Sequence, residues 1–82
     1  MVDFTLKKIK VNGLVAYEIR NGNRPIGKFS RRFGKDGDWT FSPGMLTFVN
    51  YETLQEVSEL LDKVKLNHQH GSNWLIKDYL VN

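Results

Sequence analysis

"ETLQEVSELLDKVKLN", residues 52–67, decides the fold, because its apolar residues recur with the period of a helix. One face of that helix would carry Leu54, Val57, Leu60, Leu61 and Val64. The opposite face would carry Gln55, Glu56, Glu59, Asp62 and Lys63. An apolar stripe opposite a charged one is typical of a helix that packs against a layer of other structure. The sequence therefore predicts one main helix over about residues 52–67.

Capping signals mark both ends of this helix. Thr53 and Glu56 have the spacing of a capping box, and Asn50 offers an alternative cap one turn earlier. "NHQHGS" (67–72) follows, and Gly71 suits the left-handed conformation that ends many helices. We expect the helix to stop where this segment begins.

The residues before the helix alternate with the period of β-strands. "LVAYEIR" (14–20) would turn Val15, Tyr17 and Ile19 toward the core. "IGKFSRRF" (26–33) would turn Phe29 and Phe33 inward and Lys28, Ser30 and Arg32 outward. The dipeptide Asn-Gly at 12–13 and again at 21–22 predicts two tight hairpin turns.

Two further strand segments are less regular. "FTLKKIKV" (4–11) has Phe4 and Leu6 on one parity but Ile9 and Val11 on the other, which predicts a bulge near Lys7–Lys8. "WTF" and "MLTFV" flank "SPG" (42–44), which leaves either one long, broken strand or another hairpin.

The C-terminal segment "NWLIKDYLVN" (73–82) has apolar residues in near-helical register. We expect a short C-terminal helix, with a final edge strand as the alternative, because Trp, Ile, Tyr and Val also suit strands. The expected fold class is therefore α+β. It would be an antiparallel meander of three to four strands, with the main helix packed on one face and the short helix after it.

Length and composition restrict the class of protein. The 82 residues are enough for a single domain over residues 1–82, and no cysteine is available for a disulfide or a thiolate metal site. The N-terminal residues have no signal-peptide pattern, and no run approaches the length of a membrane span. We expect a cytoplasmic protein with no membrane association and no small-molecule cofactor.

Positive charge is concentrated in the first part of the chain. Residues 1–35 carry nine Lys or Arg against two carboxylates, whereas residues 36–82 carry three Lys against seven carboxylates. Such asymmetry is typical of a protein that binds a polyanion, or of a protein with a basic face on an otherwise acidic body. A solvated sheet face that discourages aggregation is the simpler reading.

The basic residues would form a nucleic-acid-binding surface. Arg20, Lys28 and Arg32 are expected on the sheet face away from the helix, and the hairpin loop and strand end would extend it. The predicted phosphate contacts are Arg20, Arg24, Lys28, Arg31, Arg32 and Lys35. Trp39 could stack on a base if it is exposed, although a core position is the simpler expectation. The sequence distinguishes neither DNA from RNA nor any base preference.

Other chemistries find less support. "GNRPIGKF" (22–29) matches the spacing of a phosphate-binding loop, but Phe29 stands where the motif needs Ser or Thr, and a strand rather than a helix is expected to follow.

His68 and His70 could bind a metal with Asp62 or Asp78, but we expect them to be incidental. Glu18 or His68 beside Arg31 or Arg32 could serve acid–base chemistry on RNA, as in a small ribonuclease toxin. No nucleophile, paired acidic motif or cofactor fingerprint supports this, so we expect no enzyme.

Protein binding is the alternative function. The acidic helix face and the C-terminal aromatics would form the interface of a small inhibitor or adaptor of the kind that phages and mobile elements encode. Its residues would be Glu52, Glu56, Glu59, Trp74 and Tyr79. The main expectation remains a small non-enzymatic nucleic-acid-binding or nucleic-acid-associated regulatory protein.

Overall fold

The computed structural model describes residues 4–32, 34, 37–44, 50–71 and 73–81. It is an α+β fold with one sheet and one long helix. Its elements are β1 (Phe4–Val11), β2 (Leu14–Asn21), β3 (Arg24–Arg31), β4 (Trp39–Pro43), α1 (Tyr51–His70) and β5 (Leu80–Val81). The sheet order is β4-β3-β2-β1-β5. The four long strands form the expected antiparallel meander, and β5 adds a parallel edge beside β1.

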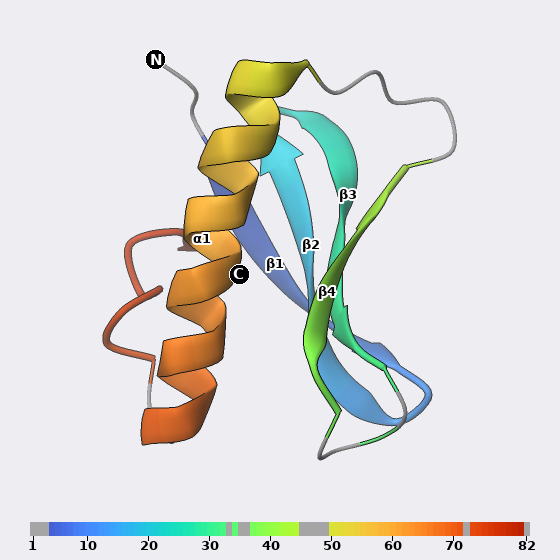
Figure 1. The fold of residues 1–82 in the computed structure, drawn as a ribbon, viewed down its shortest axis with the longest axis vertical. Helices are drawn as coiled ribbons and strands as arrows, with labels where there is room; N and C mark the ends of the chain where they lie inside the picture. Colours follow the sequence, from blue (N-terminus) through green and yellow to red (C-terminus); the bar gives the residue numbers. More distant parts are fainter. Residues whose placement is uncertain (1–3, 33, 35–36, 45–49, 72, 82) are drawn as a thin grey trace.

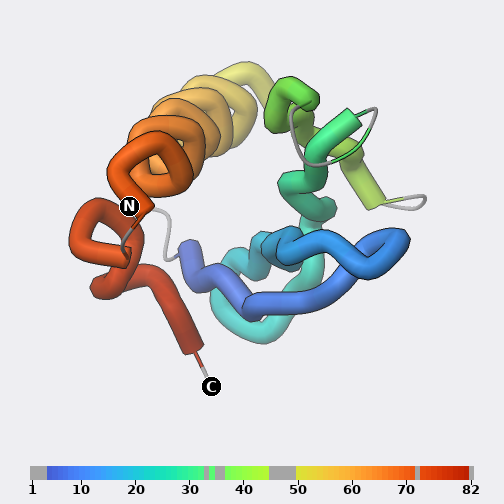
Figure 2. The backbone as a smooth tube through the Cα atoms, turned by 90° about the horizontal axis from the view of Figure 1, so that it is seen from below, coloured from blue at the N-terminus to red at the C-terminus, as the bar shows by residue number. Residues whose placement is uncertain are grey.

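Helix α1 covers one face of the curved sheet, and the C-terminal segment lies beside it (Figure 1, Figure 2). The buried face of α1 presents Val57, Leu60 and Val64 to the sheet. The sheet contributes Leu6, Tyr17, Ile19, Ile26, Phe29 and Trp39 to the same core. The core therefore lies between these two layers, as the helical and strand periods predict.

Both Asn-Gly turns close hairpins. Asn12 and Gly13 have φ values of 52° and 81°, so the two residues that join β1 to β2 are both left-handed. This is the backbone that a tight hairpin needs, and Asn-Gly adopts it at low cost. Gly22, with φ 63°, opens the turn from β2 to β3.

The bulge predicted near Lys7–Lys8 is wrong. β1 pairs with β2 in unbroken register from Phe4 to Val11. Ile9 and Val11 therefore point away from α1, where they pair across the sheet with Ala16 and Leu14 and are half-buried. The irregularity lies instead between β2 and β3, where the register shifts after Ile19.

Helix α1 is longer than the sequence predicts at its C-terminal end. Asn50 is its N-cap, and its side-chain oxygen accepts a hydrogen bond from the Thr53 amide at 2.8 Å. The helix continues to His70 and ends at Gly71, whose φ of 70° places it in the left-handed region. The segment 67–70, expected to break the helix, is its last turn.

No second helix is found in the described part of the C-terminal segment. Successive turns replace it, with hydrogen bonds from the Ile76 amide to the Asn73 carbonyl and from the Tyr79 amide to the Ile76 carbonyl. The apolar residues do not share one face, because Ile76 is fully buried while Trp74 is 56% exposed. The alternative is confirmed, since Leu80–Val81 form a short edge strand.

Some expectations fall on residues that the structure does not describe. These are the inward position of Phe33, the phosphate contact of Lys35 and the strand in 45–49. Among the described helical residues, none forms a stretch long and apolar enough to cross a bilayer.

Candidate functional site

The sheet face turned away from α1 carries a row of charged side chains. Lys7 of β1 lies opposite Glu18 of β2, and Glu18 lies opposite Lys28 of β3. These positions alternate with the buried residues Leu6, Ile19 and Phe29, so their side chains point to the outer side. The register therefore confirms an outward direction for Lys28 and adds Lys7.

Arg20 joins this row from the next outward position of β2. Its Nε donates a hydrogen bond to Oε1 of Glu18 at 2.7 Å. Because Glu18 is engaged by Arg20, it offsets only part of the positive charge that Lys7 and Lys28 place beside it. We call Lys7, Arg20, Lys28 and Arg32 the outer basic face.

The remaining predicted phosphate contacts lie in different places. Arg32 is exposed one residue after β3, on the same parity as Lys28, and its amide donates to the Asp38 carbonyl at 3.0 Å. Arg24 is exposed at the start of β3, beside the β2–β3 turn. The outer basic face thus spans β1, β2 and β3 and the chain directly after β3.

Arg31 lies on the other side of the sheet. It shares the parity of Phe29, pairs across the strands with Trp39, and points toward α1. Its guanidinium carbon lies 5.2 Å from the centroid of the Trp39 ring, and its Nη1 lies 3.3 Å from Nε2 of His68. The structure therefore separates Arg31 from Arg20, Lys28 and Arg32, with which the sequence analysis had grouped it.

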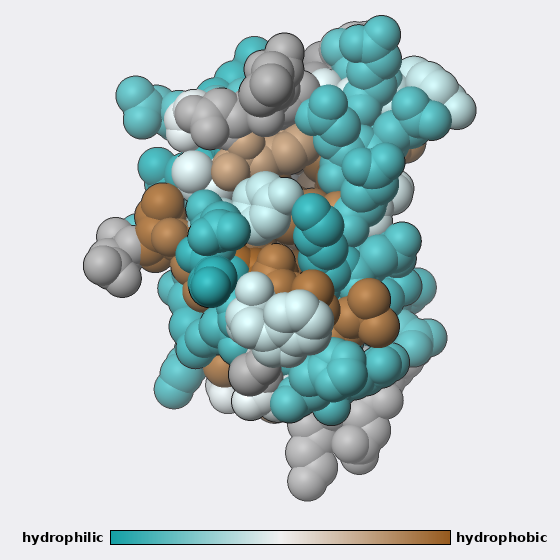
Figure 3. All heavy atoms as spheres, turned by 90° about the vertical axis from the view of Figure 1, so that its left-hand side faces the viewer, coloured by the Kyte–Doolittle hydropathy of each residue, from teal (hydrophilic) through white to brown (hydrophobic). Residues whose placement is uncertain are grey.

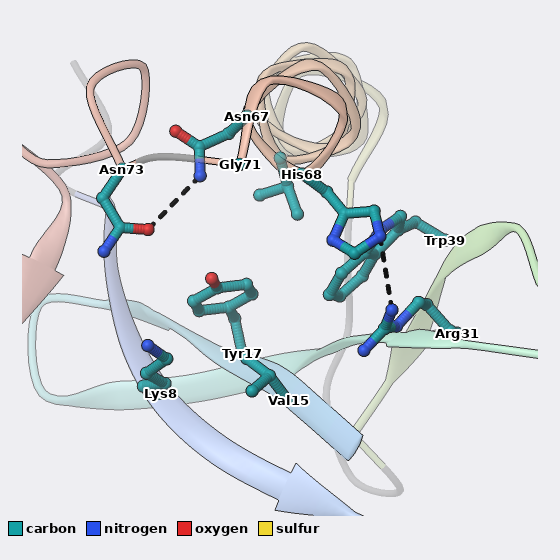
Figure 4. Close-up of a pocket in the computed structure, with 10 residues that line it drawn as sticks. Lys8, Val15, Tyr17, Arg31, Trp39, Asn67, His68, Gly71 and Asn73 are labelled. Carbon is teal, nitrogen blue, oxygen red and sulfur yellow. Dashed lines mark hydrogen bonds between the residues drawn. The ribbon is translucent and has the colours of Figure 1, made fainter. Parts of the chain in front are cut away.

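A pocket of about 340 Å³ opens where Arg31 meets the last turns of α1 (Figure 4). Its floor is made of buried residues, and its rim is exposed. The lining residues are Lys8, Val15, Tyr17, Arg31, Trp39, Val64, Asn67, His68, Gly71 and Asn73. We call this the helix-end pocket.

The strand register explains why cationic groups reach this pocket. Lys8 lies opposite Tyr17, and both point toward α1. Figure 4 shows Lys8 and Arg31 on two sides of the Tyr17 ring. None of the described residues that line the pocket is a carboxylate. It is therefore a concave site with positive charge on two walls.

Arg31 and His68 are joined by a hydrogen bond between their side-chain nitrogen atoms. A guanidinium only donates hydrogen bonds, so Nε2 of His68 is the acceptor in this contact. The His68 ring also meets the edge of the Trp39 ring, with centroids 5.7 Å apart. These contacts hold Arg31 and His68 together on one wall of the pocket.

Tyr17 supplies a protonated hydroxyl to the floor. Burial raises the pKa of Tyr17 above its ordinary value of 10.0, and the nearby Arg31 charge partly opposes this rise. Its hydroxyl therefore remains a hydrogen-bond donor at neutral pH. Tyr17 stacks obliquely on Trp39, with ring centroids 5.8 Å apart, which fixes the ring beneath the pocket.

Asn67 builds the wall on the side of the C-terminal segment. Its side chain is 4% exposed and donates to the Asn73 side-chain oxygen at 3.3 Å. Its own oxygen accepts the Leu75 amide at 3.2 Å. One buried amide therefore joins the last turn of α1 to the chain that follows it.

The residues considered for metal binding and catalysis are dispersed. Among the described residues, no group of three or more His, Cys, Asp or Glu is placed to hold a metal ion. His70 packs against Trp74, with ring centroids 5.9 Å apart, whereas His68 faces Arg31. Glu18 lies on the outer sheet face, so of the acid–base pairs considered, only His68 with Arg31 is brought into contact.

The residues expected at a protein interface differ in exposure. Glu52 and Glu59 are exposed, and Glu56 is half-buried. Trp74 is 56% exposed. Tyr79 is half-buried and engaged, because Lys63 donates to its hydroxyl at 3.0 Å and lies over its ring. Tyr79 therefore helps to hold the C-terminal segment on α1.

Comparison of the chain with protein-family models, with curated proteins and with solved structures finds no match. The support for the candidate sites therefore comes from the arrangement of their residues in the structure. Sequence reasoning missed the helix-end pocket, because Lys8, Asn67 and Asn73 have no shared motif. Lys8 has the same strand parity as the buried Leu6, which indicates that its side chain points toward α1. The bulge expected near Lys7–Lys8 would have turned it to the other face.

Proposed function

We propose that this protein binds nucleic acid, without enzymatic activity, through its outer basic face. The observation that carries the proposal is the register that places Lys7 and Lys28 on either side of Glu18, with Arg20 at the next outward position of β2 and Arg32 after β3. A basic surface two or three strands wide can enter a groove or follow a phosphate backbone. The exposed Arg24 at the β2–β3 turn extends its reach.

The mechanism is electrostatic. Each Lys or Arg that contacts a phosphate releases condensed counterions, so affinity falls steeply as salt rises. Contacts of this kind hold and orient the nucleic acid but read no sequence by themselves. We therefore expect weak discrimination between sequences and a strong dependence on salt.

Replacing Lys7 and Lys28 by Gln tests this proposal. The double variant is expected to bind a fluorescent RNA or DNA fragment at least about tenfold more weakly at ~50 mM salt, because two phosphate contacts are lost. The slope of log affinity against log salt should become shallower by about 1.5–2. Fluorescence anisotropy at a series of salt concentrations gives both quantities.

The matched control is Lys65→Gln with Lys77→Gln, which removes the same charge from the acidic half of the chain. It should bind within about twofold of the parent protein, because these residues lie off the face. Equal weakening by the two double variants would show that only net charge matters and would overturn the proposal. Arg31 is unsuited to this test, because its contacts with Trp39 and His68 link the sheet to α1.

A second candidate function is protein docking through the C-terminal segment. It is favoured by the exposure of Trp74, a residue type common at interface anchors. Figure 3 shows this side of the molecule, where hydrophobic side chains gather in the middle of the face among hydrophilic ones. Leu66 and Val81 are also exposed, at 47% and 42%.

The variant Trp74→Ala tests whether Trp74 is available as an interface anchor or is needed to stabilise the fold. We expect its free energy of unfolding to stay within about 0.5 kcal/mol of the parent, since the ring is mostly outside the core. Urea denaturation measures this change. A loss of 2 kcal/mol or more, about the cost of deleting a core side chain, would give Trp74 a structural role and remove the support for docking.

A further inference from the structure

We propose that the helix-end pocket binds a phosphate monoester of about mononucleotide size. This site lies on the helix side of the sheet, opposite the outer basic face, and the proposal does not rest on nucleic-acid binding by that face. Its volume of about 340 Å³ is at the lower end of the range of ligand pockets, about 300–1,000 Å³.

Charge favours an anionic ligand. Lys8 reaches the pocket from β1 and Arg31 from β3, and Figure 4 shows them on two sides of the Tyr17 ring, with Arg31 beside Trp39 and His68. No carboxylate among the described lining residues offsets them. A concave surface of one sign concentrates the field, so an anion is attracted more strongly here than on a flat face.

The hydrogen-bond donors favour a phosphate over a smaller or singly charged anion. A phosphate presents three terminal oxygens, and Arg31 can serve two of them with its planar fork. Lys8 and the protonated Tyr17 hydroxyl can serve another from the opposite side of the pocket. A divalent cation is disfavoured by the same groups.

The Arg31–His68 contact provides a replaceable partner for the incoming phosphate. At 3.3 Å it is a long hydrogen bond between a guanidinium and an imidazole nitrogen. A phosphate oxygen is the stronger acceptor, because both members of the new pair are charged. The ligand would therefore take over this donor of Arg31 while the Trp39 ring continues to support the guanidinium.

The rest of the pocket suits the organic part of such a ligand. Val15 and Val64 supply an apolar surface, and the Asn67 and Asn73 amides supply donors and acceptors at the wall. A few convergent polar groups on an apolar lining are typical of small-molecule sites. The ligand could be a free nucleotide or the terminal phosphate of a strand, because both present the same monoester.

Titration with adenosine monophosphate, followed by amide NMR of the isotope-labelled full chain, tests the proposal. We expect shifts at Lys8, Tyr17, Arg31 and His68, and smaller shifts with adenosine. Lys8→Gln should weaken binding about tenfold, the loss expected for one charge-assisted hydrogen bond. Lys77→Gln is the matched control, since this exposed lysine lies outside both the helix-end pocket and the outer basic face, and it should change affinity less than about twofold.

Parallel titrations identify the source of the phosphate. A short oligonucleotide is compared with and without a terminal phosphate, beside adenosine monophosphate and inorganic phosphate. Larger shifts at the pocket residues with the phosphorylated oligonucleotide than with either the unphosphorylated one or adenosine monophosphate assign the pocket to strand ends, and larger shifts with adenosine monophosphate assign it to free nucleotides. Both orders support a phosphate monoester site.

Three results would overturn the proposal. They are no shifts at about 10 mM adenosine monophosphate, a range that detects even millimolar affinity, equal shifts with adenosine, or equal weakening by Lys77→Gln and Lys8→Gln. The proposal for the outer basic face fails on different variants, Lys7 with Lys28, and on a different probe. The two proposals can therefore fail separately.

Discussion

Phe29→Ala is expected to lower the free energy of unfolding by about 3–5 kcal/mol. Phe29 is fully buried in β3, at the centre of the layer that faces α1. Its ring meets the edge of Phe41 on β4, with centroids 5.9 Å apart. Removing the ring would leave a cavity between sheet and helix, which a small core cannot fill by relaxation.

Urea denaturation followed by circular dichroism measures this loss. Domains of this size have about 5–15 kcal/mol of stability, so Phe29→Ala should leave a visible unfolded fraction or a much lower midpoint. Phe29→Leu is the control and should lose clearly less, because most of the volume remains. A loss below about 1 kcal/mol for Phe29→Ala would place the centre of the core elsewhere.

Asn67→Ala is expected to cost about 1–3 kcal/mol and to loosen residues 73–81. The substitution removes the acceptor of the Leu75 amide and the donor to Asn73. The Leu75 amide would then lose its partner, and the wall of the helix-end pocket would lose its link to α1. Hydrogen exchange reports this as faster exchange at Leu75 and Ile76.

Asn67→Asp is the informative control for this prediction. It keeps an acceptor for the Leu75 amide but loses the donor to Asn73. Protection at Leu75 should therefore survive in Asn67→Asp and fall in Asn67→Ala. Unchanged exchange in Asn67→Ala would mean that apolar packing, led by the buried Ile76, holds the segment by itself.

Local signals in the sequence were sufficient for the hairpins and the helix. Asn12 tolerates the left-handed backbone and Gly13, without a Cβ, adopts it freely, so the turn could be located from two residues. Val57, Leu60 and Val64 of the predicted stripe likewise form the buried face of α1, whereas Leu54, predicted on the same face, is 44% exposed. These features depend on neighbours within a few positions of the chain.

Features that depend on distant partners could not be predicted in the same way. The change of parity at Ile9 and Val11 predicted a bulge, whereas both residues lie on the outer face, opposite Ala16 and Leu14, and are half-buried there. The C-terminal segment looked helical, but the Asn67 side chain and the edge of β1 hold its backbone in turns and a strand.

The two candidate sites show the same division. The parity of β3 was enough to turn Lys28 outward, yet Arg31 was grouped with its neighbours by charge alone. Its actual partners, Trp39 and His68, come from β4 and the last turn of α1. A pocket assembled from four strands, the end of α1 and the chain after it has no local sequence pattern.

The parallel pairing of β5 with β1 also sets an order of events during folding. Leu6 pairs with Leu80, almost the whole chain away, whereas the hairpins join residues only a few positions apart. Closing a long loop costs more entropy than closing a short one, and distant contacts form late. We expect the meander to form first and β5 to dock last. The cationic outer face of the sheet would then form before the wall of the helix-end pocket is complete. Ligand binding in the helix-end pocket would therefore report on the final step of folding.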